Sequence, residues 1–506
     1  MRYVVGCDIG SQALKAVLWS EEGQVVATGG QEYSIVYPRP AWAEQDANYW
    51  LQAMEKVIPR LLGESGVSAK DVVAIGIDGT VDAFVPVGED GRPGAPCILW
   101  MDRRAVEQCD RIAELISPEK LFKITGLNLD PSHTAAKILW LRDHNPKEYD
   151  RTRKFMPPAT FVIYKLTGSC AVDFSNASST MIFDVRSRQW SQELLNLMDI
   201  PLGLLPEVRP ATDVVGSLTD EAARELGLSS DTLVVVGCGD EHASCVGAGV
   251  IDPGVVADIL GTAEPVCTPS HQPVFDSSQL VETHCHADPD RWLLENPGFV
   301  SGGNYRWFRD NFGTLEDFAV DVPDLSSYDL LNLEASSVNP GSDGLIFLPC
   351  MMGAMAPEWN AKARGVIYGL TLKHSRQHII RAILEGSAYA LRSIIERMQA
   401  SGCVVKEIRA VGGGAKGDLL RQIRADVTGI PVVLMSTIET TALGAALLAA
   451  VGAGLSPNLK EASKRTIKVA QVNYPIPANQ RIYDRGYGCF LRVYDSLKEC
   501  FEYCEI

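Results

Sequence analysis

An aspartate near the middle of the chain is the residue best placed to do chemistry. Asp240 comes after a β-branched run, Val234 to Val236, and a glycine-hinged turn; a segment of small residues that can form a tight helix comes after it. An acid between the end of a buried strand and the start of a helix is well placed to act as a general base. We therefore predict that Asp240 accepts a proton from a substrate.

Other acids stand at the ends of predicted strands. They are Asp8, Asp102, and either Asp78 at the end of its strand or Asp82 in the turn after that strand. Each of them alone is typical of a solvated turn. In open α/β sheets, however, ligands bind outside the carboxyl ends of the strands. Together with Asp240, these acids predict one shared cleft.

Two turns have the composition of anion-binding sites. Gly10 and Ser11 form a tight turn in which backbone amides and a hydroxyl can approach an anion, and Lys15 adds a positive charge nearby. Gly261 and Thr262 follow another predicted strand and offer an amide and a hydroxyl in the same way. Either turn alone is a weak signal for phosphate.

A glycine loop lies between a strand over 407–411 and a helix that ends near Thr428. Its Gly412-x-Gly414-x-x-Gly417 spacing matches the dinucleotide fingerprint, so a Rossmann dehydrogenase is one alternative. That fold requires an acid at the tip of the next strand, but Met435-Ser436-Thr437 stands there. The Walker A pattern is absent too. The loop instead predicts that adenine and its α-phosphate lie against the backbone at the start of the helix.

Size, charge and composition limit the class of protein. At 506 residues the chain is too long for one ordinary core, so two large domains are expected. The net charge of -17 argues against nucleic-acid binding. No signal peptide is visible at the N-terminus, and no apolar run is long enough to span a membrane. The 13 scattered cysteines fit reduced thiols, so we expect a cytoplasmic protein that does not bind membranes.

Periodicity predicts the elements that must position these residues. Two strands separated by a tight turn that carries Asp8, Gly10 and Ser11 are expected over 3–19, a further strand over 71–78, and an amphipathic helix over 377–398. The small-residue stretch 440–453 predicts a helix packed in the interior. The segment 206–216 has the composition of a connection, and the chain is expected to end in a helix over 487–503. The patterns between residues 105 and 180 are mainly helical.

A histidine-rich stretch at first suggests a metal site. In His284-Cys285-His286, only the two histidines share a face if the stretch is a strand. No cysteine or histidine lies at a useful spacing to complete a ligand set, so we do not expect a metal ion there.

Several of these motifs resemble the FGGY family of carbohydrate kinases. Gly365 to Leu370, followed after seven residues by His378 to Glu385, fits the family's C-terminal signature. The turns at Gly10 and Gly261 resemble its two phosphate motifs, and the glycine loop resembles its adenosine motif. Within the family, Trp100-Met101-Asp102-x-Arg104 is similar to stretches of xylulokinase-like pentulose kinases.

The resemblance implies an α/β fold with two RNase H-like domains flanking a central cleft, as in the actin, hexokinase and Hsp70 superfamily. Residues 1–246 would form the N-terminal domain, which mainly holds the sugar, and residues 247–506 the C-terminal domain, which mainly holds adenosine. A short internal echo, Val5 to Asp8 and Val236 to Asp240, fits a duplicated fold.

The resemblance also implies how ATP and Mg²⁺ bind. The phosphates would contact Ser11, Gln12, Lys15, Gly261 and Thr262. Adenosine would contact the glycine loop, at Gly412, Gly413, Gly414, Ala415 and Lys416. Mg²⁺ would lie near Asp8 and Asp240, held mostly through water.

For the sugar, the resemblance implies contacts with Val81, Asp82, Asp102, Asp240 and Glu241. Asp240 would take the proton of a terminal hydroxyl as its oxygen attacks the γ-phosphate. Partners would then be a small sugar and ATP, with a homodimer left open. Xylulokinases carry Gln-Met-His where this chain has Thr80-Val81-Asp82, so a carboxylate that accepts hydrogen bonds replaces an imidazole.

The departures leave the substrate open. A pentulose such as D-xylulose is the leading prediction. Another ketose such as ribulose, or a polyol of the erythritol type, is the alternative, because an aspartate at the position of Asp82 also occurs in polyol kinases. A non-catalytic nucleotide switch of the actin and Hsp70 type is an alternative from a different class.

Overall fold

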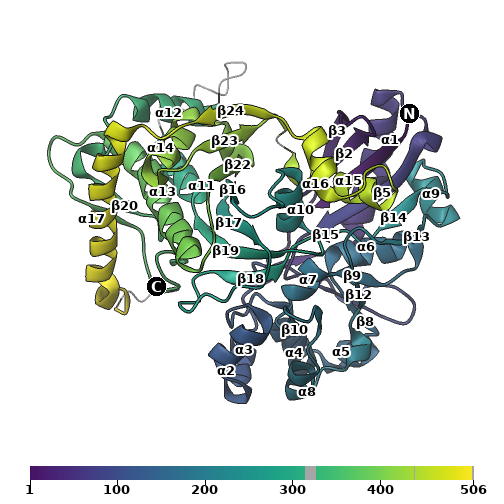
Figure 1. Cartoon of the computed structure of the whole chain (residues 1–506). Coiled ribbons are helices and arrows are strands. Elements are labelled where there is room, and N and C mark those ends of the chain that lie inside the picture. The colour runs from purple at the N-terminus through teal and green to yellow at the C-terminus, as the bar shows by residue number, and fades with distance from the viewer. Residues whose placement is uncertain (314–325, 438, 504–506) are drawn as a thin grey trace.

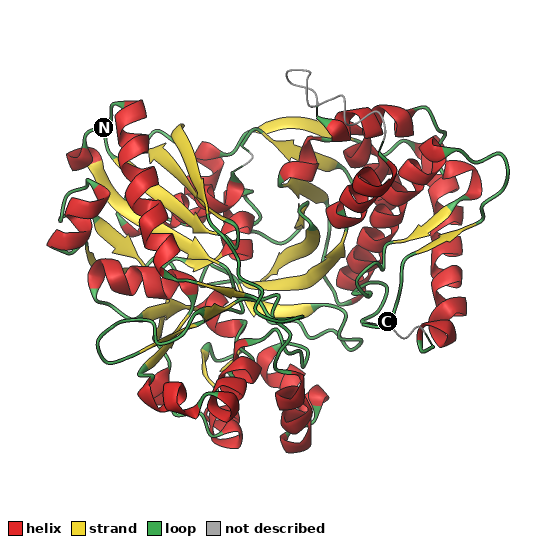
Figure 2. Cartoon of the chain, turned by 180° about the vertical axis from the view of Figure 1, so that it is seen from behind, coloured by secondary structure: helices red, strands yellow, loops and turns green. Residues whose placement is uncertain are grey.

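The structure is a computed structural model, and it describes residues 1–313, 326–437 and 439–503. Two lobes, each built around a twisted sheet, lie side by side (Figure 1). Helices that lie in sequence between β5 and β13, among them α2 to α5 and α8, gather below the N-terminal lobe. Figure 2 shows the same two lobes from behind, with helices covering both sheets.

The first sheet has the order β13-β14-β5-β1-β2-β3, and β15 also pairs with β5. Strand β1 runs antiparallel to β2 and parallel to β5, and β5 runs parallel to β14 and β15. The strands are β1 (Tyr3–Ile9), β2 (Ala13–Ser20), β3 (Val25–Glu32), β5 (Val72–Gly79), β13 (Val214–Ser217), β14 (Leu233–Val235) and β15 (Cys238–Gly239). Strands β1 and β5 are buried on both faces, and so read as nearly continuous apolar runs.

The second sheet repeats the central pattern of the first. Strands β16, β17 and β19 form an antiparallel meander, and β22 and β23 continue it in parallel from β16. Its strands are β16 (Val255–Ile259), β17 (Ala263–Ser270), β18 (Glu282–Cys285), β19 (Trp292–Val300), β22 (Glu407–Val411), β23 (Val432–Met435) and β24 (Val469–Asn473). The two-domain α/β architecture predicted from the sequence is confirmed.

The short sequence similarity between Val5 to Asp8 and Val236 to Asp240 does not come from this repeat. Val5 to Asp8 lies on β1, and Val236 to Asp240 passes through β15. Both strands pair with β5 in the same sheet, so the two segments are neighbours within one domain. The repeat itself relates β1 to β16, which differ in sequence.

The remaining elements complete the two lobes. The helices are α1 (Asn48–Ser65), α2 (Val106–Leu115), α3 (Pro118–Thr125), α4 (Thr134–His144), α5 (Pro146–Arg151), α6 (Pro158–Thr167), α7 (Phe174–Ser178), α8 (Gln192–Met198), α9 (Asp220–Leu226), α10 (Asp240–Gly247), α11 (Gly302–Phe312), α12 (Ser327–Ser336), α13 (Arg376–Ala400), α14 (Asp418–Thr428), α15 (Thr440–Gly452), α16 (Leu459–Thr466) and α17 (Pro477–Phe501). The short strands are β4 (Glu44–Gln45), β6 (Val85–Val87), β7 (Cys97–Ile98), β8 (Lys154–Met156), β9 (Ala171–Asp173), β10 (Phe183–Asp184), β11 (Gln189–Trp190), β12 (Glu207–Arg209), β20 (Ile346–Leu348) and β21 (Val366–Tyr368).

Most predicted elements are confirmed, and two were wrong in part. The helices over 377–398 and 440–453 are α13 and α15. The supposed connection over 206–216 contains β12 and most of β13, because short edge strands carry little periodic signal. The final helix begins at Pro477 rather than Tyr487, since proline suits the first turn of a helix. Among the described residues, no helix is both long and apolar enough to cross a membrane.

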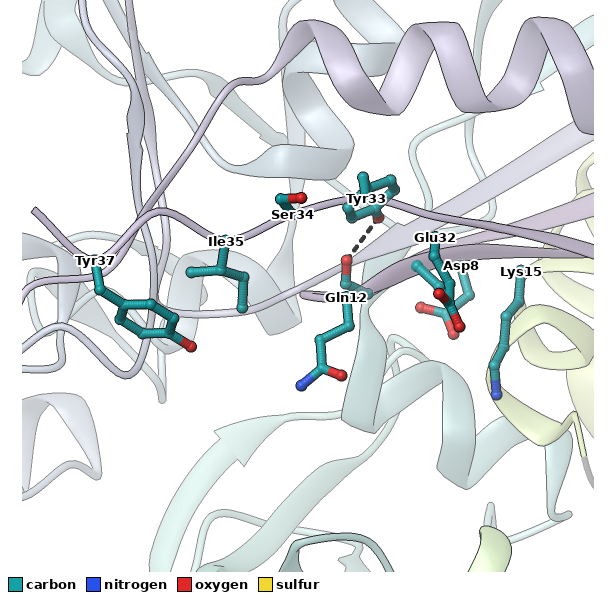
Figure 3. A pocket seen from close by; sticks show the side chains of 10 residues that line it. Asp8, Gln12, Lys15, Glu32, Tyr33, Ser34, Ile35 and Tyr37 are labelled. Atoms are coloured by element: carbon teal, nitrogen blue, oxygen red, sulfur yellow. Dashed lines mark hydrogen bonds between the residues drawn. The ribbon is translucent and has the colours of Figure 1, made fainter. Parts of the chain in front are cut away.

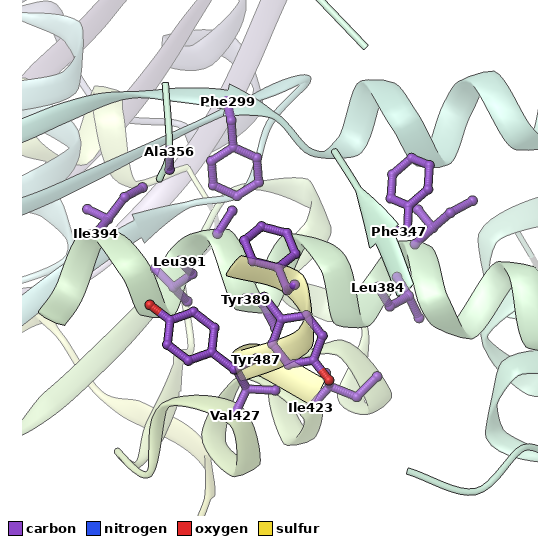
Figure 4. Close-up of a cluster of buried hydrophobic side chains, with 14 of the residues drawn as sticks. Phe299, Phe347, Ala356, Leu384, Tyr389, Leu391, Ile394, Ile423, Val427 and Tyr487 are labelled. Atoms are coloured by element: carbon purple, nitrogen blue, oxygen red, sulfur yellow. The ribbon is translucent and has the colours of Figure 1, made fainter. Parts of the chain in front are cut away.

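The core of the C-terminal lobe forms where α13, α14 and α17 meet the second sheet. Tyr389 and Leu391 of α13 pack with Val427 of α14 and Tyr487 of α17, and Phe299 of β19 closes the cluster (Figure 4). Removing apolar side chains of this size from water stabilises the fold by about 1.5–3 kcal/mol each. The amphipathic pattern of α13 therefore marks the face that this lobe buries.

Helix α15 crosses α10 at unusually close range and covers the first sheet. A Cβ on Gly444 of α15 would stand 1.9 Å from the carbonyl oxygen of Ala243, and one on Gly247 of α10 would stand 1.8 Å from that of Thr440. Helix α15 approaches β1 just as closely, because a Cβ on Gly6 would be 2.0 Å from the oxygen of Ala442. The small residues of α15 thus allow a late segment of the chain to pack on the first domain.

We expect Gly444→Ala to destabilise the protein by about 1–3 kcal/mol, because a methyl group there must push two backbones apart. The midpoint of urea unfolding measures this. Gly63→Ala in α1 is the matched control: nothing lies within 4 Å of a Cβ there, so stability should stay unchanged or rise slightly. Equal stability of the two variants would contradict the close packing of α10 and α15.

Candidate active site

Three carboxylates meet at the ends of adjacent parallel strands. Asp8 on β1 lies in register with Asp78 on β5, and Asp78 lies opposite Cys238 of β15. Asp240 follows two residues later as the first residue of α10. Asp78 is fully buried and Asp8 nearly so. The prediction that the strand-end acids share one place is confirmed for these three.

Burial raises the pKa of each of these groups. It raises the pKa of Asp8 to about 6, against the opposing effect of Lys15, and the pKa of Asp240 to about 8, helped by the charges of Glu241 and Asp8. The pKa of Asp78 is raised well above its usual range by burial and by Asp8. Among the described residues no N–H group donates to Asp78, and the side chain that contacts it is the carboxyl group of Asp8. Such clustered, unpaired carboxylates suit a shared proton or a divalent cation.

Backbone amides hold Asp240 in place. The N–H of Glu241 donates to its Oδ1 at 2.9 Å, and the N–H of Val81 also donates to the carboxylate. Val81 lies against Gly239, where a Cβ would come within 2.4 Å of its side chain. The structure therefore brings together Asp240, Glu241 and Val81 through the turn after β5.

Asp82 has a partner that sequence analysis missed. Its Oδ1 lies 3.0 Å from Nδ1 of His133, the residue before α4, and its carbonyl accepts a hydrogen bond from Lys137 Nζ at 2.7 Å. Burial alone would lower the pKa of His133, but Asp82 raises it to about 9. His133 is therefore protonated at neutral pH, and its buried Nε2 has no partner among the described residues. An imidazole donor thus stands beside the carboxylate of Asp82.

We expect the Asp82–His133 pair to make stability depend on pH. The folded-state pKa of His133 lies above its unfolded value of 6.5, so its contribution is complete below pH 6.5 and is lost as pH rises through about 9. The contribution is on the order of 3 kcal/mol. Urea unfolding of wild type and Asp82→Asn at several pH values measures it. A gap between the two proteins that stays constant across this range would contradict the pairing.

Asp102 is placed differently from the other predicted sugar contacts. It is fully buried, and its two oxygens accept four hydrogen bonds, from the N–H of Ala43 and from the backbone and guanidinium of Arg104. A carboxylate has about four acceptor positions, so none is left for a sugar. The guanidinium of Arg104 in turn contacts the rings of both Trp42 and Trp140, 3.8 Å and 4.8 Å from their centroids. A direct sugar contact of Asp102 stays an untested prediction.

The first predicted phosphate turn borders a pocket of about 670 Å³. Asp8, Gln12 and Lys15 point into it from β1, β2 and the turn between them (Figure 3). Tyr33 closes the other side and donates a hydrogen bond of 2.6 Å to the carbonyl of Gly10. Ser11 is partly buried, and its hydroxyl accepts from Trp100 Nε1 at 3.1 Å.

Lys15 is not a free cation in this structure. Its Nζ forms a 2.8 Å ion pair with Glu439, just before α15, and both side chains are partly exposed. Ion pairs of this exposure contribute little to stability, so an anion can compete for the lysine.

The second phosphate turn and the glycine loop lie against each other. Gly261 and Thr262 join β16 to β17, at the position that Gly10 and Ser11 occupy in the first sheet. Gly414 N–H donates to the carbonyl of Leu260 at 3.2 Å, and a Cβ on Gly412 would come within 2.9 Å of the same oxygen. In the loop, Gly413, Gly414 and Lys416 are exposed, and Ala415 is buried. Two segments 150 residues apart thus form one exposed glycine surface.

Two repeated domains with an acid at the strand ends between two glycine-rich turns define a phosphotransferase of the sugar-kinase class. Models of the FGGY family of carbohydrate kinases match residues 3–247, as its N-terminal domain, and 256–453, as its C-terminal domain. The chain belongs to this family, whose fold is that of the actin, hexokinase and Hsp70 superfamily and whose members use ATP. These findings set aside the dehydrogenase and the non-catalytic switch.

Similar proteins differ in the substrate that they are named for. The chain is 30% identical to a xylulose kinase of Lactococcus lactis subsp. lactis, over 99% of this chain and 98% of that protein. It is 32% identical to a glycerol kinase of Paraburkholderia phytofirmans, over 91% of each. The crystal structure of ligand-bound xylulose kinase from Lactobacillus acidophilus matches with a TM-score of 0.91 and 26% identity, over the whole of both chains.

Proposed function

We propose that this sugar kinase phosphorylates a terminal hydroxyl of a pentulose such as D-xylulose. The observation that carries the proposal is the position of Asp240, fixed by two backbone amides beside the Asp82–His133 pair. The similarity to proteins named xylulose kinase supports the choice of sugar. The glycerol kinase of comparable identity makes another ketose or a polyol the alternative.

Asp240 is the general base in this proposal. Its carboxylate accepts the proton of the terminal hydroxyl, whose oxygen then bonds to the γ-phosphorus of ATP while the bond to the β–γ bridging oxygen breaks. ADP leaves with the electron pair of that bond. Because phosphoryl transfer depends mainly on positioning and charge stabilisation, the amides that orient Asp240 matter as much as its basicity.

The sugar lies between donors and acceptors of the first domain. Asp82 and Glu241 accept hydrogen bonds from hydroxyl groups, and the unpartnered Nε2–H of His133 donates one. A ketose offers both a carbonyl acceptor and hydroxyl donors, which suits this combination. Val81 presents its backbone and an apolar side chain next to the base.

The nucleotide contacts residues from both domains. The amides of Ser11 and Gln12 and of Gly261 and Thr262 bind phosphate oxygens, with Lys15 released from Glu439 to join them. Adenosine lies on Gly412, Gly413, Gly414, Ala415 and Lys416.

The acidic strand ends suit the magnesium ion of the nucleotide. In the described part of the chain, Asp78 has no cation or N–H group beside its carboxyl group, and the pKa values of its neighbours are raised, which fits a divalent cation, so Asp8, Asp78 and Asp240 would hold Mg²⁺ through water. When bound, Mg²⁺ neutralises charge on the phosphates. The division into a sugar-binding domain, 1–246, and an adenosine-binding domain, 247–506, is part of this proposal, as is a cytoplasmic location.

A coupled ADP assay over a panel of sugars tests the proposal. We expect ADP release with D-xylulose to exceed that with ribulose, erythritol or glycerol by at least about tenfold in kcat/KM. A higher kcat/KM for a polyol than for D-xylulose would instead favour the alternative, a polyol kinase. ATP turnover that does not respond to any member of the panel would contradict a pentulose or polyol substrate.

A further inference from the structure

A second group of buried polar side chains lies beside the proposed active site and is not among the residues proposed for phosphoryl transfer. It consists of His242 on α10, His284 on β18 and Glu295 on β19. One ligand atom from each residue lies within 4.8 Å of the other two. Their exposed fractions are 1%, 4% and 3%, so water does not solvate them. This group is called the His–Glu cluster below.

Each member of the His–Glu cluster has a polar atom with no hydrogen-bond partner among the described residues. The atoms are Nδ1 of His242, Nε2 of His284 and Oε2 of Glu295. The separation of 4.0 Å between the last two is too long for a hydrogen bond. A buried polar atom without a partner costs about 1–3 kcal/mol, so three of them at one point indicate a missing ligand.

The ring of His284 is oriented as a metal ligand would be. Its Nδ1 lies 3.4 Å from the hydroxyl of Ser179, on the side away from the unpartnered Nε2. A hydrogen bond from the far nitrogen of a ligating histidine fixes its tautomer and leaves the near nitrogen free to bind. Burial lowers the pKa of His242 well below its usual range, which keeps that imidazole in the neutral, metal-binding form.

The sequence-based argument against a metal ion at His284 was wrong about the partners. Strand β18 ends at Cys285, so His286 leaves the strand, and its ring contacts the carbonyl of Val250 and the N–H of Asp288. His284 instead shares a face with Glu282 on β18 and with Glu295, because Glu282 and Glu295 lie directly opposite each other. The second histidine comes from α10, which no local spacing could indicate.

From this geometry we infer that the His–Glu cluster is a binding site for a transition-metal ion of the Zn²⁺ type, separate from the Mg²⁺ of the nucleotide. Two imidazoles and one carboxylate are a ligand set typical of zinc and poor for magnesium, which prefers oxygen and water. Three protein ligands leave a fourth position open, as in catalytic zinc sites.

Distances and charges agree with this assignment. Ligands bound at about 2.0–2.1 Å in a tetrahedral site lie about 3.3–3.4 Å apart, so ligand atoms that now lie within 4.8 Å of one another would move together by up to about 1.4 Å. Glu241 forms a hydrogen bond with Glu295, and Oε2 of Glu282 lies 3.8 Å from Nε2 of His284. A divalent cation would offset the charge of these buried carboxylates, whose pKa values at Glu241 and Glu295 are raised by burial.

The site has a direct connection to the sugar-binding residues. Glu241 is the neighbour of Asp240 and forms a hydrogen bond with the proposed ligand Glu295. A metal ion held by Glu295 would therefore be linked to the residue next to the proposed base through a single carboxyl–carboxyl contact. This inference concerns metal binding and stands whether or not the substrate is a pentulose.

Metal analysis of the intact protein tests the inference. The chain is expressed in zinc-supplemented medium, purified without a histidine tag and dialysed, and its metal content is measured by mass spectrometry. We expect about one zinc per chain in the wild type and at least about tenfold weaker Zn²⁺ affinity in His284→Ala and Glu295→Gln, measured against a chromophoric chelator. His271→Ala, in an exposed turn, is the matched control and should keep wild-type affinity.

A second measurement guards against variants that fold poorly. ZnCl₂ added to metal-free wild-type protein should raise its Tm, because a ligand that binds only the folded state stabilises it, whereas Glu295→Gln should show no rise. Wild-type protein that retains no zinc and shows no shift in Tm would overturn the inference. So would zinc that is retained by His284→Ala but lost from Asp78→Asn, because the ion would then sit at the strand-end carboxylates.

Discussion

Asparagine in place of Asp240 is expected to lower kcat by about 10²- to 10⁴-fold while the Kd for ATP stays unchanged. The amide keeps the size of the side chain and can still accept the hydrogen bond from Glu241 N–H, but it cannot take a proton. Because ATP is proposed to bind through the two glycine turns, its affinity should not depend on this group. A coupled ADP assay gives kcat, and titration calorimetry gives the Kd.

The exposed Asp231→Asn, in the loop before β14, is the matched control and should keep wild-type kinetics. Asp240→Asn protein with more than about a tenth of wild-type kcat would remove the residue from its role as base. Loss of ATP binding together with activity would instead indicate that Asp240 acts mainly by organising the nucleotide site.

Removal of Arg424 is expected to cost about 3–5 kcal/mol in the free energy of unfolding. Arg424 of α14 is fully buried and pairs with Asp258 of β16 and, through two bonds of 2.7 Å and 2.6 Å, with Glu264 of β17. Arg424→Met would leave two buried carboxylates without a counter-charge. Denaturant unfolding followed in the C-terminal lobe measures the loss.

Two further variants distinguish the loss of the buried network of Arg424, Asp258 and Glu264 from a general effect of lost charge. Lys464→Met removes an exposed ion pair with Glu461 and should change stability by less than about 1 kcal/mol. Arg424→Met combined with Asp258→Asn and Glu264→Gln should recover part of the loss, because no charge is then left unpaired. No recovery would mean that packing of the long side chain, rather than charge, explains the effect.

The same network connects stability to the nucleotide site. Asp258 and Glu264 lie on the two strands that the turn at Gly261 and Thr262 connects. Because Arg424 pairs with both carboxylates, it helps to hold in place the turn that is proposed to bind phosphate. We therefore expect the surviving folded fraction of Arg424→Met to show a raised KM for ATP.

Local sequence determined the elements and the backbone turns of the site. The strand over 407–411, the helix that ends at Thr428 and the strand that follows are found as predicted, because a β-branched run, an apolar period and a stop at Gly429 are all local signals. The same holds for the strand over 71–78, whereas Asp8, expected in the turn after the first strand, lies on β1 itself. The turns at Gly10 and Gly261 are likewise visible in the sequence, because a glycine followed by a serine or threonine interrupts the apolar pattern of a strand.

Only the tertiary structure decided which side chains meet. Asp82 forms a hydrogen bond with His133, Asp102 accepts hydrogen bonds from Arg104, and Lys15 forms an ion pair with Glu439. The His–Glu cluster joins a helix of the first domain to two strands of the second. Hydrogen bonds and metal ligands form between groups that sheet register and helix crossing bring together, and a single sequence records neither the register nor the crossing. The base Asp240 could be found from its own turn, but its surroundings come from distant parts of the chain.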